Sequence, residues 1–150
     1  MALVALDTIL ESNKGGVWFV PGVEARAVQA CAKKAGFAYY HIDGKQITRK
    51  EQLLNAVATA LHFPKSFGHN WDALEECLVD LDMDSDGFVI FYDHIDGLLA
   101  AHPDQFETLV EVLRDAVGSW KEDDMAMAVL LSGAKAPKGV PKLKEPDAED

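Results

Sequence analysis

Two runs of consecutive apolar residues constrain the fold of this chain most strongly. Residues 88–92 read Phe-Val-Ile-Phe-Tyr, and residues 125–131 read Met-Ala-Met-Ala-Val-Leu-Leu. Strands without polar alternation are typical of parallel sheets that helices cover on both faces. Between the two runs, Pro103 suits the first turn of a helix, and apolar residues recur at helical spacing from Phe106 to Val117. A strand, a helix and a second strand in this order predict parallel pairing with a right-handed crossover.

The first third of the chain continues the alternation. Residues 17–20 form a short apolar run closed by Pro21-Gly22, and residues 37–42 form a β-rich run closed by Asp43-Gly44, so both are predicted strands. The Ala-rich segment 24–35 contains neither Pro nor Gly and predicts a helix that Gly36 ends. The predicted fold class is therefore α/β, with a small three- to four-stranded parallel sheet packed with helices.

Two more helices are predicted in the middle of the chain. Thr48 and Glu51 fit a capping box at the start of the first helix, and Pro64 ends it. The second helix begins near Asn70, a residue type that caps helices well. Its apolar residues recur at helical spacing and form one stripe: Leu74, Cys77, Leu78 and Leu81. Because Cys77 belongs to this stripe, we expect it to be buried and chemically inert.

Composition narrows the classes of partner. The chain has 14 Lys and Arg against 25 Asp and Glu, a formal net charge of −11. Nucleic acids and anionic membranes attract the opposite charge, so neither is a predicted partner, whereas basic proteins and cations are attracted. The two cysteines, Cys31 and Cys77, form no metal or redox motif, and the N-terminus lacks the basic region of a signal peptide. With no apolar stretch long enough to span a membrane, the predicted location is the cytoplasm.

Sequence motifs for catalysis are absent. The chain has no GxSxG elbow, P-loop, GxGxxG or HExxH, and its five histidines include no pair four residues apart on one predicted helix. We therefore interpret the histidines as solvated or core-edge residues and expect no enzyme activity, cofactor or bound metal.

One acidic segment keeps a calcium site as a less favoured alternative. Asp82, Asp84 and Asp86 precede Gly87 with the spacing that opens a calcium-binding loop. However, Ile90 stands at the ninth position of such a loop, Asp93 replaces the expected Glu at the twelfth, and a strand follows directly. An acidic turn between a helix and a strand is the simpler interpretation.

The second predicted helix carries an acidic face. Asp72 and Glu76 are four residues apart, so they are neighbours on the face opposite the apolar stripe. Like charges in this arrangement cost a few tenths of a kcal/mol, which the favourable position of Asp72 near the helix N-terminus offsets. Any solvated helix tolerates such a pair, so the geometry alone does not assign a role.

Residues 63–78, Phe-Pro-Lys-Ser-Phe-Gly-His-Asn-Trp-Asp-Ala-Leu-Glu-Glu-Cys-Leu, resemble the hallmark segment of the barstar family, intracellular inhibitors of barnase-type ribonucleases. Ile42-Asp43-Gly44 and residues 112–116 and 129–132 also resemble family segments. The resemblance covers residues 37–132 and implies a small parallel sheet packed with helices. It leaves residues 1–36 as an N-terminal extension, expected to add a strand and a helix packed on the domain. Residues 133–150, rich in Pro and charge, are predicted to be a disordered tail.

The resemblance implies a binding mechanism and a set of contact residues. Family members press an acidic helix and the loop before it into the active site of a ribonuclease, where carboxylates take the places of RNA phosphates. Carried over, Asp72 and Glu76 are the leading anchors, and the partner is a basic ribonuclease or a related basic protein toxin bound 1:1. The remaining implied contacts lie around these anchors or on the long helix: Ser66, Gly68, Asn70, Trp71, Glu75, Val79 and Asp115.

Three positions depart from the family pattern. Ser66 stands where the family has an aromatic contact, Glu75 also replaces an aromatic residue, and Glu76 is one methylene longer than the usual Asp. Because aromatic anchors contribute strongly to binding, these changes favour a ribonuclease other than barnase, or another basic toxin. A barstar-like module that binds a basic partner other than a nuclease is the main alternative.

Overall fold

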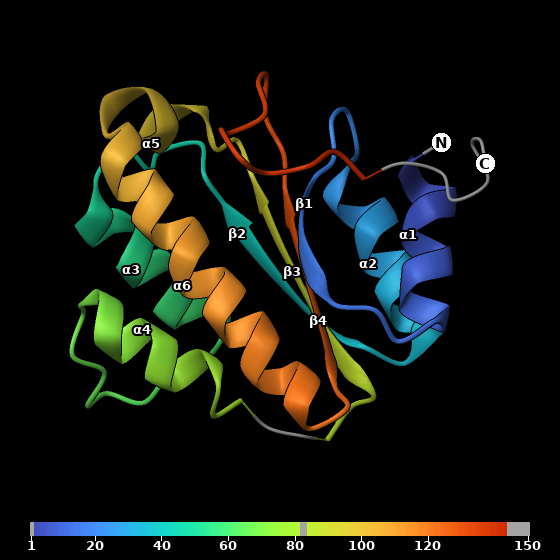
Figure 1. Cartoon of the computed structure of the whole chain (residues 1–150). Coiled ribbons are helices and arrows are strands. Elements are labelled where there is room, and N and C mark those ends of the chain that lie inside the picture. Colours follow the sequence, from blue (N-terminus) through green and yellow to red (C-terminus); the bar gives the residue numbers. More distant parts are fainter. Residues whose placement is uncertain (1, 82–83, 144–150) are drawn as a thin grey trace.

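The computed structural model describes residues 2–81 and 84–143 and arranges them in three layers, with a parallel sheet between two layers of helices (Figure 1). The sheet has four strands in the order β1-β4-β3-β2. Their bounds are Gly16–Phe19 for β1, Ala38–Asp43 for β2, Gly87–Asp93 for β3 and Ala126–Leu131 for β4. Each neighbouring pair is parallel, so the predicted α/β class and parallel sheet are confirmed.

The direction in which the chain crosses the sheet explains the two helical layers. From β1 at one edge the chain passes through α2 (Ala25–Ala35) to β2 at the other edge, and then returns strand by strand through β3 to β4. Crossovers that run in opposite directions and keep the right-handed sense place their helices on opposite faces. Accordingly α2 and α1 (Ala2–Glu11) cover one face, while the returning crossovers cover the other with α3 (Lys50–Ala60), α4 (Trp71–Leu78), α5 (Asp96–Ala101) and α6 (Pro103–Glu122).

The central strand β3 is buried on both faces. Phe88, Ile90 and Tyr92 belong to the core under α3, α4 and α6, whereas Val89 and Phe91 belong to the core under α1 and α2. All five side chains are no more than 2% exposed. This double burial is what the unbroken apolar run predicts.

Gly36 and Pro103 lie at the helix ends that the sequence predicts, whereas the capping box predicted for α3 does not form. Gly36 ends α2 in the left-handed region at φ 80°, and α6 begins with Pro103. The predicted capping box of Thr48 and Glu51 is wrong, because α3 begins at Lys50 and the capping side chain is that of Gln52. Its Oε1 accepts hydrogen bonds from the backbone N–H groups of Thr48 at 2.9 Å and Arg49 at 3.1 Å. The helix therefore begins one position later than the capping motif predicts.

The two terminal regions pack closely on the sheet. Residues 2–36 hold α1, β1 and α2. The predicted disordered tail is wrong for residues 133–143, since Val140 and Leu143 are buried. Phe19 in β1 donates its N–H to the Pro141 carbonyl at 2.8 Å and accepts from the Leu143 N–H at 3.0 Å. Residues 144–150 lie outside the described part of the chain.

Within the described ranges, no helix is long and apolar enough to cross a membrane.

A buried hydrogen bond joins the end of α4 to the end of α6. The indole Nε1 of Trp120 donates to the Leu78 carbonyl at 2.8 Å, and the Trp120 ring lies 4.8 Å from the ring of Phe88. The last carbonyls of a helix lack intrahelical partners, so this bond satisfies one of them. It also fixes α4 against α6 and β3, which determines where the acidic face of α4 lies.

Replacing Trp120 tests this coupling. Trp120→Phe removes the donor and leaves the Leu78 carbonyl buried and unpaired, which costs about 1–3 kcal/mol in the free energy of unfolding. Urea denaturation followed by circular dichroism measures the loss. The control is Trp18→Phe, at a half-buried tryptophan packed on the opposite face of the sheet. Equal losses in the two variants would show that the Trp120 hydrogen bond does not stabilise the fold.

Candidate partner-binding surface

The loop between α3 and α4 is held by a cluster of rings. Phe67 is buried, and its ring lies 5.1 Å from that of Phe63 and 4.7 Å from that of His69. The Phe67 N–H donates to the Pro64 carbonyl at 2.9 Å, which closes a turn. Ser66 lies exposed in this turn. The loop is therefore anchored to the core from beneath while its outer side stays free for contact.

Asn70 caps α4 as predicted. Its Oδ1 accepts a hydrogen bond from the Ala73 N–H at 2.7 Å, and its backbone is extended at φ −141° and ψ 173°. Its Nδ2 also donates to the carbonyl of Gly68 at 3.4 Å. One side chain thus fixes both the first turn of α4 and the end of the preceding loop.

The two faces of α4 separate as the sequence predicts. Leu74 and Leu78 are 1% exposed and pack in the core, while Asp72 and Glu76 are exposed on the other side. Among residues 2–81 and 84–143, no salt bridge involves Asp72 or Glu76. The helix ends at Leu78, so Leu81 belongs to the core from outside the helix, which is shorter than predicted. The two carboxylates are available to a cation from outside the molecule.

The other predicted contact residues surround this pair to different degrees. Ser66, Gly68 and Asn70 are exposed, Glu75 and Trp71 are half-buried, and Val79 is 36% exposed, an unusual exposure for a large apolar side chain here. The Trp71 ring has the Lys50 Nζ 5.2 Å from its centre. Asp115 is exposed on α6, the helix that packs beside α4. Eight of the nine residues therefore lie on one continuous loop and helix with its cap, and Asp115 is on a separate element.

A hollow flanks the acidic face. Its volume is about 510 Å³, and it opens beside the edge strand β2. Aromatic, aliphatic and acidic side chains line it together: Tyr40, Leu61, His62, Phe63, Pro64, Glu76, Cys77, Asp80 and Leu81. Carboxylates beside aromatic rings favour a cationic side chain, so this hollow suits an Arg or Lys of a partner.

Cys77 lies at this hollow and is half-buried, so the prediction that it is buried is wrong. Burial raises the pKa of its thiol above the ordinary value, and the negative charges of Asp80 and Glu76 raise it further. The thiol stays protonated near neutral pH, which keeps it unreactive. The expected inertness of Cys77 therefore follows from partial burial together with the neighbouring carboxylates.

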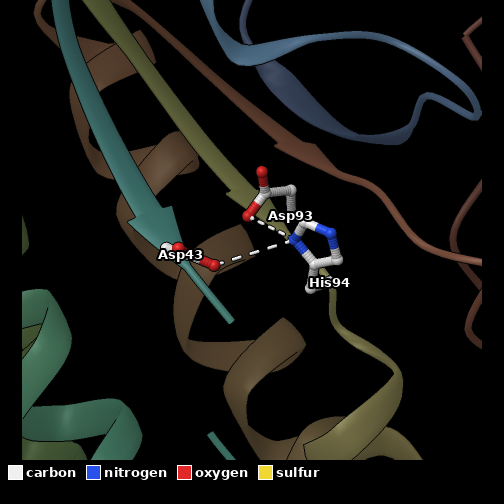
Figure 2. A group of neighbouring side chains, drawn as sticks. All are labelled: Asp43, Asp93 and His94. Atoms are coloured by element: carbon white, nitrogen blue, oxygen red, sulfur yellow. Dashed lines mark ion pairs between the residues drawn. The ribbon is translucent and has the colours of Figure 1, made fainter. Parts of the chain in front are cut away.

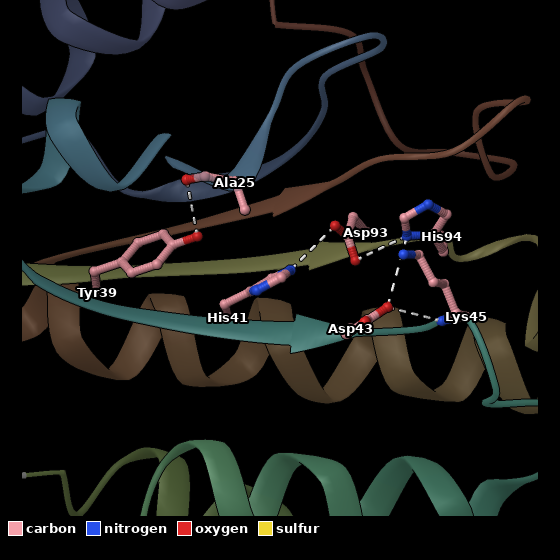
Figure 3. A network of polar contacts seen from close by, with 7 residues as sticks. All are labelled: Ala25, Tyr39, His41, Asp43, Lys45, Asp93 and His94. Carbon is pink, nitrogen blue, oxygen red and sulfur yellow. Dashed lines mark hydrogen bonds and ion pairs between the residues drawn. The ribbon is translucent and has the colours of Figure 1, made fainter. Parts of the chain in front are cut away.

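Sequence reasoning missed a polar group at the carboxyl ends of β2 and β3 (Figure 3). Asp43, Asp93 and His94 lie together there, and His41 contacts Asp93. The signal was present, since an Asp directly follows each of two predicted strands, 37–42 and 88–92, and parallel strands place their carboxyl ends at one edge. No histidine considered alone indicates the group, because it forms only when the pairing of β2 with β3 brings together residues about fifty positions apart.

The calcium alternative cannot be placed, since Asp82 and Met83 lie outside the described residues. Asp84 and Asp86 are exposed. In the described part of the chain, the cluster of at least three potential metal-ligating side chains is Asp43, Asp93 and His94.

Comparison with known proteins gives one family and a general fold likeness. Residues 37–132, more than half of the chain, match the sequence model of the family described as Barstar (barnase inhibitor). No curated protein matches the chain. A structure of the Aeropyrum pernix ORC2 protein in ADPNP-ADP complexes is 15% identical with a TM-score of 0.57, covering 89% of this chain and 39% of that one. Drosophila ORC bound to DNA is 12% identical with a TM-score of 0.46, covering 95% and 75%. The chain thus spans about 39% of the ORC2 protein, and that likeness concerns the fold alone.

Replacing Asn70 tests how firmly the cap holds the acidic helix. Asn70→Ala leaves N-terminal N–H groups of α4 without a partner, and we expect a loss of about 1 kcal/mol in the free energy of unfolding, measured by urea denaturation. Asn70→Asp keeps an acceptor at the same position and is the matched control, with stability close to that of the unchanged chain. A loss in the Asp variant as large as in the Ala variant would contradict the capping role.

The pH dependence of Cys77 alkylation measures how strongly the nearby carboxylates raise the pKa of its thiol. Because only the thiolate reacts, alkylation of Cys77 by iodoacetamide should reach half of its maximal rate at a pH above the ordinary thiol pKa. Asp80→Asn and Glu76→Gln remove the charges that raise this pKa, so each should move the midpoint to lower pH. Mass spectrometry of the Cys77 peptide separates it from Cys31, whose pKa burial raises to about 11. Asp104→Asn, on α6, is the control, and an unmoved midpoint in both test variants would contradict the electrostatic account.

Proposed function

Because the chain belongs to the barstar family, we propose that it inhibits a basic, barnase-type ribonuclease by covering the active site of that enzyme with α4 and the preceding loop. The observation that carries the proposal is the pair of exposed carboxylates, Asp72 and Glu76, side by side on a capped helix and free of salt bridges with the described residues. The pair lies inside the segment that matches the family.

Electrostatics make this mode of inhibition effective. An enzyme that cleaves RNA holds the phosphate with Arg, Lys or His, and carboxylates of α4 can occupy the same positions. At 4 Å and an effective dielectric of about 20, each such contact attracts by about 4 kcal/mol before the cost of desolvation. The fixed cap and the ring cluster under the loop reduce the conformational entropy lost on binding. The helix therefore presents its charges in a largely prepared geometry.

The net negative charge of the chain raises the rate of association with a basic ribonuclease. A formal charge of −11 attracts a basic ribonuclease over long distances and raises the association rate. Salt screens this attraction, with a Debye length of about 8 Å at physiological ionic strength. A cell that makes a ribonuclease needs its inhibitor to bind quickly, so rapid 1:1 association in the cytoplasm is part of the proposal.

The departures from the family pattern bear on which ribonuclease is bound. Ser66 offers a small hydroxyl instead of a ring, and Glu75 is half-buried and charged. The hollow beside Glu76 has room for a long cationic side chain. The extra methylene of Glu76 lets its carboxylate reach such a side chain inside the hollow. These features favour a partner that supplies an Arg or Lys at the flank of α4 and needs fewer aromatic contacts from the loop.

A second candidate function is binding of a basic protein that is not a nuclease. The loss of aromatic contacts at Ser66 and Glu75 favours it, because aromatic anchors are the strongest contributors at many interfaces. The same acidic surface would be used. Complex formation without any loss of ribonuclease activity distinguishes this function from the first.

The double variant Asp72→Ala/Glu76→Ala tests the proposal. We expect the unchanged chain to inhibit RNA cleavage by a cognate basic ribonuclease at one equivalent, and the variant to bind at least roughly 100-fold more weakly, since each anchor contributes about 2 kcal/mol or more. Inhibition is measured as residual cleavage of a fluorogenic RNA across a panel of small basic ribonucleases.

The matched control is Asp7→Ala/Glu11→Ala on α1, which removes the same two residue types at the same spacing from the opposite face of the sheet. It reduces the net negative charge by the same two units and should inhibit nearly as well as the unchanged chain. Equal weakening in both double variants would mean that only net charge matters and that α4 is not the contact surface.

A further inference from the structure

The polar cluster at the ends of β2 and β3 owes its existence to strand register. Asp43 is the last residue of β2 and Asp93 the last of β3, and they are direct partners in the parallel ladder. His94 follows Asp93 immediately and turns its ring toward both carboxylates (Figure 2). Its backbone is in the left-handed region at φ 53°. Two side chains from the ends of neighbouring strands and one from the residue after β3 therefore lie close together.

The spacing of the three side chains suits a shared metal ion. The Nδ1 atom of His94 lies 3.2 Å from Asp93 Oδ1 and 3.7 Å from Asp43 Oδ1. The three potential ligand atoms all lie within 4.8 Å of one another. Zinc binds nitrogen and oxygen ligands at about 2.0–2.2 Å in a tetrahedron, which separates neighbouring donors by about 3.3–3.6 Å. The separations of 3.2 Å and 3.7 Å bracket that range.

One carboxylate oxygen of the cluster is buried and lacks a hydrogen bond. Asp93 Oδ1 has essentially no contact with solvent and no hydrogen-bond partner, although His94 Nδ1 is close to it. The other oxygen, Oδ2, lies 3.0 Å from Nε2 of His41. Because an ionised carboxylate can only accept, His41 donates this bond. A buried acceptor without a hydrogen bond is costly, and a cation at the centre of the cluster would satisfy it.

The surroundings of the cluster hold its ligands in place. The ring of His41 stacks 5.6 Å from that of Phe91, so the side chain that positions Asp93 is itself packed. The Lys45 N–H donates to Asp43 Oδ1 at 3.1 Å and orients that carboxylate. The Gly44 N–H donates to the Asp93 carbonyl at 3.0 Å, and a Cβ on Gly44 would come within 2.4 Å of the same oxygen. Outer contacts of this kind are what keep metal ligands in position.

We propose that Asp43, Asp93 and His94 form a binding site for a divalent transition-metal ion of the zinc class. One imidazole nitrogen with two carboxylate oxygens is a donor set that zinc accepts, whereas calcium takes six or more oxygens. Three protein ligands leave a fourth position open to water or to another group. The bound ion would tie the carboxyl ends of β2 and β3 together.

This site is separate from the proposed inhibitory surface. The cluster lies at the carboxyl end of β3, next to α5, whereas the chain passes from the end of α4 to the amino end of β3 (Figure 1). The proposal of a metal site does not depend on ribonuclease inhibition, because Asp43, Asp93 and His94 are not among the contact residues of that surface.

The test is a zinc titration of the full chain. Zinc chloride alone is the probe, bound zinc is measured by competition with a fluorescent chelator, and the melting temperature is a second readout because binding to the folded state stabilises it. We expect one equivalent bound and a rise in melting temperature. Asp43→Asn and His94→Asn should each weaken binding by at least about tenfold. Asn tolerates a left-handed backbone, so the second change removes the imidazole with little strain.

The controls are matched in residue type and backbone. His62 is exposed and left-handed like His94, so His62→Asn is its counterpart, and Asp104→Asn is the counterpart of Asp43→Asn. Because His62 and Cys77 line the hollow beside α4, His62→Asn and Cys77→Ser also test zinc binding there. Binding retained in all three controls supports the proposal. No binding of zinc, or binding that survives Asp43→Asn and His94→Asn or is lost in a control, would overturn it and leave His94 as an ion-pair partner of the two carboxylates.

Discussion

Burial of β3 on both faces is the constraint from which the rest of this structure follows. Val89 and Phe91 point to one side and Phe88, Ile90 and Tyr92 to the other, and none is more than 2% exposed. Two helical layers are therefore required. The layer over Val89 and Phe91 comes from α1 and α2, which lie outside the segment that matches the barstar family. Residues 2–36 thus supply the edge strand β1 and one of the two helical layers. Without them an apolar face of the sheet would be exposed to water.

The same arrangement explains how an acidic helix is presented. The layer formed by α3 to α6 is fastened to the sheet through the apolar faces of its helices, so their outer faces are free to carry charge. In α4 the Leu74 and Leu78 side chains supply the attachment, and Asn70 at one end and Trp120 at the other fix its position. Asp72 and Glu76 can then face outward with little cost in stability. Stability and the proposed binding function reside on opposite sides of one short helix.

Much of this fold could be predicted from the sequence because the strongest signals are local. The apolar runs of β3 and β4, Gly36 after α2, Pro103 at the start of α6 and Asn70 at the start of α4 each act within a few residues. The alternation of strands and helices along the chain then predicts parallel pairing. For the candidate surface, the local motif around Asn70, Asp72 and Glu76 was enough to name the residues, although their role in binding stays a prediction.

The features that the sequence did not predict depend either on competition between neighbouring side chains for one role or on contacts between residues far apart in the sequence. Gln52 rather than Glu51 caps α3, because the start of the helix moved by one residue and brought another side chain into reach. Val140 and Leu143 pack beside β1 although prolines and charges surround them, since two apolar anchors suffice when a sheet edge is open to them. The cluster of Asp43, Asp93 and His94 required the register of two strands, which composition and spacing do not give.

The central claim, that α4 and the loop before it form the inhibitory contact, is tested most directly by hydrogen–deuterium exchange of the chain alone and with one equivalent of an inhibited ribonuclease. The account predicts slower exchange in residues 66–79 of the complex, with little change in residues 2–11 on the far face of the sheet. Inhibition of the enzyme with unchanged exchange in residues 66–79 and protection elsewhere would contradict it.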